Sequence, residues 1–398
     1  MSEQNKCVEI KSKDIPLIYE LSRPGRRAFE LPALDVPEVD LSSIIPQKLL
    51  RQKKANLPEV DKLQVVRHYT NLSKRNVGVD GTFYPLGSCT MKYNPKINEK
   101  VASMPSFALL HPYQPENDVQ GMLEVLYSMQ EYLKDISGLS AVSLMPSDGA
   151  HGELTSLMVV KAYHKAKGRN PNLILIPDSA HGTNPASCAI SGYDVKTIKS
   201  SERGCLAISD LQANLSENVA ALMITNPNTL GLFEENILEI AKKVHEVGGL
   251  VYMDGANMNA LLGIARPGDF GIDVMHFNLH KTFSTPHGGG GPGSGPIAVG
   301  ENLKDFLPGP IIAKDGEKYK CANPSHSIGR TRSFLGNTGI ILRAYSYIRR
   351  MGKEGIANVA KMAVLNANYV LANLKKDYDV EIGRAHVWTS VTNHHLVC

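Results

Sequence analysis

Lys281 stands between an apolar segment, 274–278, and a run of four glycines, 288–291. A lysine at the end of a buried strand becomes a nucleophilic amine when desolvation or a nearby cation lowers its pKa. Consecutive glycines let the backbone approach a ligand, because they have no Cβ. Taken alone, the pattern also fits a surface lysine beside a flexible hairpin.

Asp254 is the last residue of a second apolar segment, 250–254. The next apolar segment, 274–278, lies between Asp254 and Lys281. A carboxylate at such a strand end can hold a cationic ring nitrogen. A carboxylate and a lysine on neighbouring strand ends form the layout of a pyridoxal-phosphate site. Taken by itself, Asp254 is better explained as the N-cap of a following helix.

The segment 147–153, "SDGAHGE", joins a strand to a helix and contains candidates for an anion site. Backbone amides at a helix N-terminus attract phosphate, and glycines allow a close approach. Gly149, Ala150 and His151 are the candidate contacts. Strand–turn–helix glycines are common in other settings, so the motif alone is a moderate signal.

Polar residues also follow two further strands. His181 lies in "DSAHGTNPAS", where its ring can lie flat against a planar ligand or simply cap a turn. Thr225, Asn226 and Thr229 end the next strand and would line the same crevice. An anion cradle, a stacking ring, a carboxylate and a lysine on successive strand ends are what a pyridoxal-phosphate enzyme of the aspartate-aminotransferase fold requires.

Apolar strands that alternate with helices position these residues. A helical period runs over 118–138 and ends at Gly138. The pattern predicts an α/β fold with a mostly parallel sheet covered by helices on both faces, which binds ligands at the strand ends. The predicted strands are 141–145, 173–177, 219–225, 250–254 and 274–278, and the predicted helices between them include about 153–167 and 236–247.

The flanks of this region differ from it. Residues 1–60 are rich in proline and apolar residues, and we expect an extended arm that packs on the body or on a partner rather than a disordered leader. Residues 61–330 then form the large domain. Residues 331–381 form the start of a small C-terminal domain, with helices at 335–351 and 354–374 and a possible strand in "YDVEIG".

Composition excludes several classes. The 398 residues carry 43 Lys+Arg and 39 Asp+Glu, a net charge of +4, which is too balanced to predict nucleic-acid binding. No uninterrupted apolar run reaches membrane-spanning length. The six cysteines are scattered and include no C-x-x-C pair, so reduced thiols are expected. The first residues lack signal-peptide and transit-peptide character, and we expect a cytosolic protein without bound metal.

Long motifs between about residues 17 and 375 closely resemble the glycine cleavage system P-protein, in particular subunit 2 of its two-subunit bacterial form. They include "LSRPGRRAFELPALDVPE", "YPLGSCTMKYNPKINE", "AHGTNPASCAISGY", "FEENILEIAKKVHEVGGLVYMDGANMNA" and "GIARPGDFGIDVMHFNLHKTFSTPHGGGGPGSGP". The resemblance implies fold type I, with an incomplete small C-terminal domain here.

The resemblance also implies residue roles. Lys281 would carry pyridoxal 5'-phosphate covalently, Asp254 would pair with the ring nitrogen, and His181 would stack on the ring. The phosphate would contact Gly149, Ala150 and His280. The loop Ser88, Cys89 and Thr90 would line the substrate side.

The implied reaction is decarboxylation of glycine, with transfer of the aminomethyl group to the lipoyl arm of the H-protein. The implied partner is P-protein subunit 1, in a two-plus-two assembly, and because that homologue lacks the lysine, Lys281 marks this chain as the catalytic subunit. Two alternatives stay open: another pyridoxal-phosphate lyase or aminotransferase of the same fold, and a non-catalytic scaffold subunit.

The last segment, 382–398, does not resemble the family. "IGRAHVWT" within it resembles translated sequencing-adapter read-through and contains the chain's single tryptophan, Trp388. We expect the native sequence to depart from this one at about residue 381, in which case the tail is not biological. A natural, divergent C-terminus is the alternative, and resequencing the locus distinguishes the two.

Overall fold

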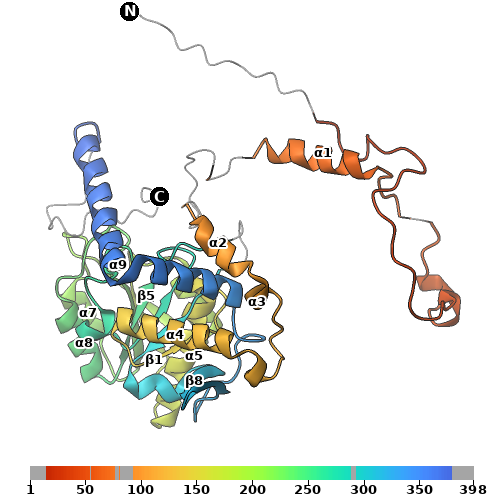
Figure 1. Cartoon of the computed structure of the whole chain (residues 1–398). Helices are drawn as coiled ribbons and strands as arrows, with labels where there is room; N and C mark the ends of the chain where they lie inside the picture. The colour runs from red at the N-terminus through yellow and green to blue at the C-terminus, as the bar shows by residue number, and fades with distance from the viewer. Residues whose placement is uncertain (1–14, 54, 77–79, 81–92, 288–292, 379–398) are drawn as a thin grey trace, which may run out of the picture. The chain divides into compact units, whose positions relative to one another are not determined.

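The computed structural model describes residues 15–53, 55–76, 80, 93–287 and 293–378. Contacts divide the chain into two compact units, Met1–Tyr84 and Pro85–Cys398, and each unit is described by itself. Figure 1 traces both. The expected domain boundaries at residues 60 and 330 stay a prediction.

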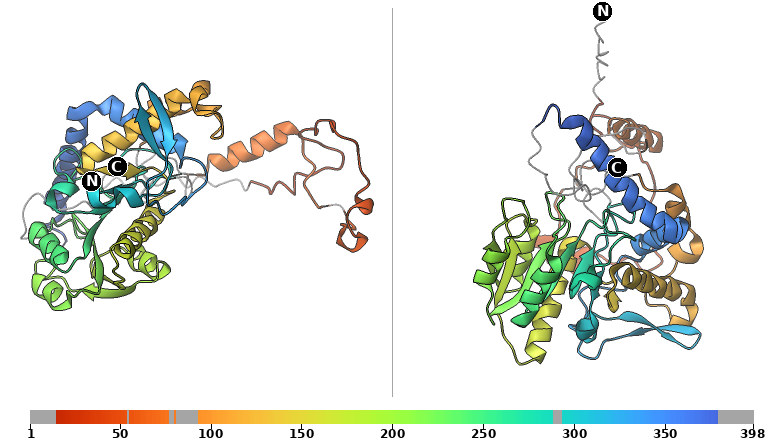
Figure 2. Two further views of the ribbon diagram at one scale, coloured as in Figure 1. Left: turned by 90° about the horizontal axis from the view of Figure 1, so that it is seen from below. Right: turned by 90° about the vertical axis from the view of Figure 1, so that its left-hand side faces the viewer.

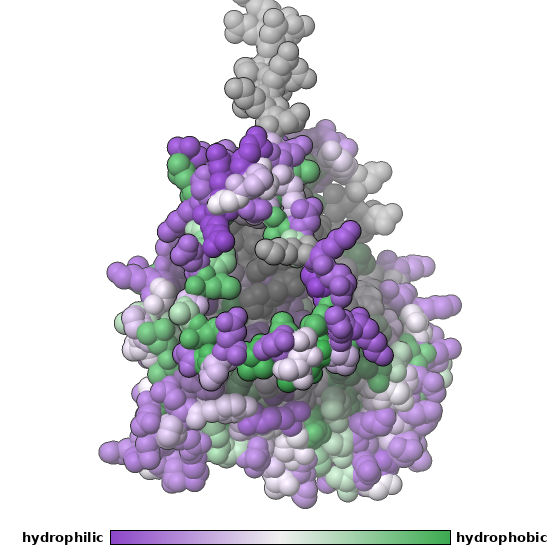
Figure 3. Space-filling view, turned by 90° about the vertical axis from the view of Figure 1, so that its right-hand side faces the viewer, coloured by the Kyte–Doolittle hydropathy of each residue, from purple (hydrophilic) through white to green (hydrophobic). Residues whose placement is uncertain are grey.

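The first unit has little regular structure. Its elements are η1 (Leu41–Ser43), η2 (Gln47–Leu49) and α1 (Lys62–Ser73). The α1 helix begins with a capping box, in which Asp61 accepts from the Gln64 backbone N–H. Large apolar side chains lie at the surface among hydrophilic ones (Figure 3); Phe29 is 74% exposed and Leu31 is 81% exposed. The segment turns back on itself, since the Arg23 backbone N–H donates to Glu59 O at 2.8 Å, and the expected extended arm stays a prediction.

In the described part of the second unit, seven strands form one sheet in the order β1-β7-β6-β5-β4-β2-β3. All strands run parallel except β7, which is antiparallel to both β1 and β6. The mostly parallel sheet predicted from the sequence is therefore confirmed. The strands are β1 (Ala141–Ser143), β2 (Leu173–Pro177), β3 (Asp194–Ile198), β4 (Val219–Thr225), β5 (Leu250–Gly255), β6 (Val274–Phe277) and β7 (Ile297–Val299).

Helices cover both faces of the sheet, as predicted (Figure 2). One face packs against α5 (Gly149–Ala166), α6 (Thr183–Ile190) and η5 (Glu301–Phe306). The other packs against α4 (Gln120–Ser137), α7 (Ile208–Asn214), α8 (Ile237–Glu246) and α9 (Thr338–Leu374). Alternate side chains of β5 enter the two layers: Tyr252 lies in the first and Met253 in the second. This alternation is what a fully covered strand requires.

Most element boundaries follow the predicted pattern. The α4 helix ends at Gly138, whose φ of 71° is the left-handed conformation typical of a C-cap glycine. The α5 helix begins at Gly149, earlier than the expected Glu153, because Asp148 caps it. Two predicted C-terminal helices correspond to α9, which contains non-helical backbone at Gly352. The expected strand in "YDVEIG" falls almost wholly outside the described residues.

Several elements have no counterpart in the sequence prediction. The edge strand β3 is largely exposed and polar, and β7 has only three residues, so neither presents a long apolar run. The other elements that the sequence analysis did not predict include α6 and α7 as well as α2 (Lys96–Ala102), α3 (Pro105–Ala108), η3 (Glu116–Asp118), η4 (Pro267–Phe270) and the hairpin of β8 (Ile311–Asp315) and β9 (Lys318–Ala322). No helix in the described part is long and apolar enough to cross a bilayer.

Candidate active site

A cavity of about 290 Å³ lies at the carboxyl ends of β4, β5 and β6. Parallel strands end at the same edge of the sheet, so residues far apart in the sequence converge there. The cavity is lined by Asp148, Gly149, Ala150, Glu153, His181, Thr183, Thr225, Pro227, Asn228, Thr229, Asp254, Ala256, Asn257, His276, Asn278, His280, Lys281 and His287.

The carboxylate of Asp254 is held at the end of β5, where it is 5% exposed. Its Oδ1 accepts a hydrogen bond from the Ala256 backbone N–H at 2.9 Å and lies 3.5 Å from Nε2 of His276. The sheet register places Asp254 directly beside His276 on β6. Backbone pairing therefore fixes the orientation of this carboxylate before any ligand is present.

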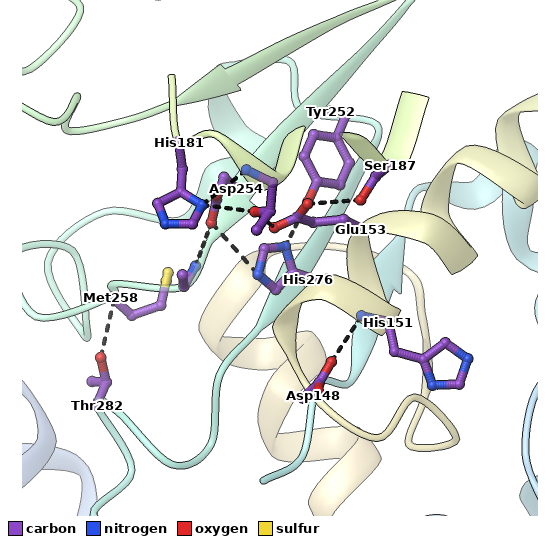
Figure 4. Close-up of polar contacts among 12 residues, drawn as sticks. Asp148, His151, Glu153, His181, Ser187, Tyr252, Asp254, Met258, His276 and Thr282 are labelled. Carbon is purple, nitrogen blue, oxygen red and sulfur yellow. Dashed lines mark hydrogen bonds and ion pairs between the residues drawn. The ribbon is translucent and has the colours of Figure 1, made fainter. Parts of the chain in front are cut away.

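His276 is buried and is oriented by Tyr252 (Figure 4), with 2.5 Å between the Tyr252 hydroxyl and Nδ1 of His276. Burial raises the pKa of Tyr252 well above its usual value, so the phenol stays protonated and donates to Nδ1. Burial also lowers the pKa of His276, against the opposing charge of Asp254, so the ring is neutral. Its Nε2–H then faces Asp254.

A second buried carboxyl group, Glu153, lies beside this pair. It is 4% exposed and projects from α5. Ligand atoms of Glu153, Asp254 and His276 all lie within 4.8 Å of one another. Burial, followed by the charge of Asp254, raises the pKa of Glu153 to about 7. The site therefore contains a second buried carboxyl group, whose protonated form is favoured by its surroundings.

The N-terminus of α5 approaches the end of β6 closely. A Cβ on Gly149 would lie 2.5 Å from Oδ1 of Asn278, so only glycine fits without displacing that buried amide. In the first turn of a helix the amides have no intrahelical partner, which leaves those of Gly149 and Ala150 open to an anion. The amide of His151 instead donates to Asp148 Oδ1 at 2.8 Å.

The turn that carries Lys281 is tied to its surroundings. The Lys281 backbone N–H donates to Asn278 O at 3.0 Å. The hydroxyl of Thr282 accepts from the Met258 N–H at 3.1 Å, which links this turn to the loop after β5. Ser284 has a φ of 55°, an uncommon left-handed conformation for a non-glycine residue. These contacts position Lys281 opposite the end of β5.

The structure brings most of the predicted site residues to one cavity: Gly149, Ala150, His181, Thr225, Asp254, His280 and Lys281 all line it. His151 does not, because its ring lies beside Ser147, with Nδ1 accepting from the Ser147 N–H at 3.1 Å. Ser88, Cys89 and Thr90 lie outside the described residues. The chemical roles of all these residues stay predictions.

Sequence reasoning missed Glu153, Tyr252 and His276. A buried strand containing histidine, "VMHF", was a usable signal, because an unpaired imidazole in an apolar run needs a partner. Tyr252 gave the complementary signal on the neighbouring strand. An acid in the first turns of a helix is so common that Glu153 gave no distinctive pattern.

The donor set matches an aromatic aldehyde phosphate with a basic ring nitrogen. An amine, a buried carboxylate and open helix amides all line one small cavity. Buried polar atoms of the lining residues, among them Thr225 Oγ1, His276 Nε2 and Asn278 Oδ1, have no hydrogen-bond partner among the described residues. Buried polar atoms without partners are costly and indicate a missing ligand or water. The residues present therefore fit pyridoxal phosphate.

Comparison with solved structures defines the class of protein. The chain aligns with a P-protein glycine decarboxylase in inhibitor-bound form at a TM-score of 0.70, with 21% identity over 84% of this chain and 77% of that one. A Burkholderia pseudomallei sphingosine-1-phosphate lyase gives a TM-score of 0.59 at 13% identity, covering 82% of this chain and 76% of that one. The fold is fold type I, that of pyridoxal-phosphate-dependent transferases.

Sequence comparison identifies the family. The family model described as "Glycine cleavage system P-protein" matches residues 32–322. "Probable glycine dehydrogenase (decarboxylating) subunit 2" from Staphylococcus haemolyticus is 56% identical over 93% of this chain and 76% of the relative. The protein of that name from Staphylococcus aureus (strain Newman) is 55% identical, with the same coverage. The chain belongs to the glycine cleavage system P-protein family, which confirms the resemblance.

Proposed function

We propose that this chain is the pyridoxal-phosphate-binding subunit of a glycine dehydrogenase (aminomethyl-transferring, decarboxylating). It releases the carboxyl group of glycine as CO2 and transfers the remaining aminomethyl group to the lipoyl arm of an H-protein. One observation carries this proposal: Lys281 and Asp254 line the same cavity in a chain of the P-protein family.

The residues of the chain have separate tasks. Lys281 would hold the cofactor, because its amine can bond covalently to the cofactor's aldehyde. Asp254, oriented by His276, holds a proton on the ring nitrogen, and the bound cofactor then supplies an electron sink for the carbon that loses CO2. The ring of His181, which lines the same cavity, would contact the face of the cofactor. Gly149, Ala150 and His280 bind its phosphate.

Two further points concern the burial of Asp254 and the electrons released in the reaction. The buried environment of Asp254 strengthens its interaction with a cationic ring, because the local dielectric is lower than in water. The electrons of the overall reaction pass to the lipoyl disulfide, which is reduced as a carbon–sulfur bond forms. No oxidant beyond the H-protein is required.

The name "subunit 2" in the relatives supports a partner subunit 1. We propose that the two subunits form a two-plus-two assembly in the cytosol and that the lipoylated H-protein docks on it as a co-substrate. The exposed apolar residues of the N-terminal unit are candidates for the surface that subunit 1 covers.

Reconstitution tests the function. The full chain is combined with pyridoxal phosphate, subunit 1 and lipoylated H-protein, and glycine-dependent release of labelled CO2 is measured. We expect release that requires every component. Release from another amino acid but not from glycine would favour a different lyase of this fold. Activity of subunit 1 without this chain would favour a scaffold role.

A further inference from the structure

Glu153 lies beside the cavity with both carboxyl oxygens in hydrogen-bonded contact (Figure 4). Oε1 is 2.7 Å from Oγ1 of Thr183, and Oε2 is 2.9 Å from Oγ of Ser187. Among the described residues, no lysine or arginine forms a salt bridge with it. An ionised carboxylate buried to this extent would normally require a cationic partner.

Hydrogen counting around Thr183 identifies where a proton must lie. Its hydroxyl has one hydrogen but contacts two groups at 2.7 Å, Glu153 Oε1 and His181 Nδ1. The Thr183 backbone N–H also points at His181 Nδ1, at 3.2 Å. Nδ1 therefore accepts and carries no hydrogen, and the Thr183 hydroxyl donates to it. The Thr183 hydroxyl could donate to an ionised Glu153 only if it did not donate to Nδ1, so with Nδ1 accepting, the contact with Oε1 needs a hydrogen from Glu153.

The charges around Glu153 favour the same arrangement. Asp254 and Asp148 both oppose its ionisation, and burial opposes it more strongly. Cys188 on α6 and Tyr252 on β5 also interact with Glu153, and burial raises the pKa of each, so both stay neutral. His276 on β6 is neutral as well, and Lys281 acts on His276. No neighbour named here supplies a contacting positive charge.

We propose that Glu153 is a positioning residue that acts as a neutral carboxylic acid, and that its proton, relayed through the Thr183 hydroxyl, fixes His181 as the Nε2–H tautomer. The relay runs from Glu153 Oε1–H to Thr183 Oγ1 and from Thr183 Oγ1–H to His181 Nδ1. Its use in holding a cofactor ring rests on the proposed function, whereas the tautomer itself is a property of this chain alone.

The arrangement has a chemical consequence for the cavity. A neutral Glu153 leaves Asp254 as the nearest negative charge to a ring nitrogen held there. An ionised Glu153 would add a second anion within 4.8 Å of the first. It would also draw the Thr183 hydrogen toward itself and leave Nδ1 of His181 to take a proton. The tautomer of His181 thus depends on the protonation of Glu153.

The test uses the full chain without cofactor, so its outcome is independent of catalysis. Infrared difference spectra, wild type minus Glu153→Gln, are recorded from pH 5 to 9. We expect the carbonyl stretch of a protonated carboxylic acid at low pH, fading with a midpoint near the pKa of about 7. Its absence at every pH would overturn the proposal.

Nitrogen-15 spectra of histidine-labelled protein report the tautomer, with His181→Gln assigning the signals. At pH 9 we expect wild-type His181 to carry its hydrogen on Nδ1. Glu153→Gln should keep it on Nε2, because its amide still donates to Thr183. In the Thr183→Val background, chains with Glu153 and with Glu153→Gln should give the same His181 tautomer at pH 9, because the relay is broken in both. Identical His181 tautomers in wild type and Glu153→Gln at pH 9 would overturn the relay.

A matched control is Glu234→Gln. Glu234 is also a buried glutamate, 2% exposed, and burial raises its pKa. Its oxygens accept instead from the Leu206 backbone N–H, at 3.2 and 3.0 Å. This variant should leave the His181 signals unchanged. A change equal to that in Glu153→Gln would reveal a general response to losing a buried acid, and would contradict a specific relay.

Discussion

The strand-end site and the N-terminal unit use their side chains in opposite ways. The sheet unit buries polar groups such as Asp254 and His276 inside an apolar frame, with 3.5 Å between Oδ1 of Asp254 and Nε2 of His276. The N-terminal unit exposes apolar groups such as Phe29 and Leu31. Burying charge is costly and exposing large apolar surface is unfavourable, so each pattern implies a ligand or partner. The first suits a small polar ligand, and the second suits a protein surface.

The largest expected effect is that of Lys281→Ala, which should disable the strand-end site and leave the N-terminal unit unchanged. We expect complete loss of covalently bound pyridoxal phosphate and an unchanged fold, because the residue lies at a turn rather than in the core. Absorbance before and after borohydride reduction measures the bond, and circular dichroism checks the fold. The control is Lys320→Ala, on the exposed β8–β9 hairpin. A reducible bond that persists in Lys281→Ala would move the site to another lysine.

Asp254→Asn should have the next largest effect. It removes the charge that favours a protonated ring nitrogen, while the amide can still accept from Ala256. We expect a loss of about 3 kcal/mol in transition-state stabilisation, a rate lower by about 100-fold or more. Glycine-dependent CO2 exchange measures it in the reconstituted system. Asp315→Asn, at an exposed position, is the control; similar rates in both variants would rule out the assigned role.

The pH dependence of stability tests whether the buried carboxyl of Glu153 behaves as described. Its folded pKa of about 7 lies above the reference value of 4.5, so the folded state binds the extra proton. Stability should therefore fall as pH rises from about 4.5 through 7, by about 3 kcal/mol in total. Denaturant unfolding at pH 5 and pH 8 measures this, and Glu153→Gln should remove that part of the slope. A wild-type slope unchanged by the substitution would contradict it.

The smallest expected effect lies in the N-terminal unit. Deleting residues 1–45 should weaken assembly with subunit 1 by about tenfold, or about 1.4 kcal/mol. It should leave cofactor binding on Lys281 unchanged, since none of the cavity-lining residues belongs to that segment. Co-purification with tagged subunit 1 compares deleted and intact chains. Equal recovery would remove the assembly role and leave the strand-end site untouched.

Sequence reasoning was strongest where local pattern decides the structure. The β2 and β4 strands match their predicted ranges, because continuous apolar runs bounded by polar turns allow few alternatives. Asp254 and Lys281 were identified because Asp254 ends such a run and Lys281 follows one closely. Glu153 could not be found in this way, since its character comes from Thr183, Ser187 and Asp254, which only the folded sheet brings near it.

The close approach of Gly295 to the residue before α5 limits how this protein can diverge. A Cβ at Gly295 would lie 1.8 Å from the backbone oxygen of Asp148, a contact that rotation of a side chain cannot relieve. Gly149 meets Asn278 from the same turn. Side chains around the cavity can change size and be accommodated, but the spacing between the backbones of Gly295 and Asp148 cannot. Mutational tolerance should therefore be low at Gly295, a residue that carries no side-chain functional group.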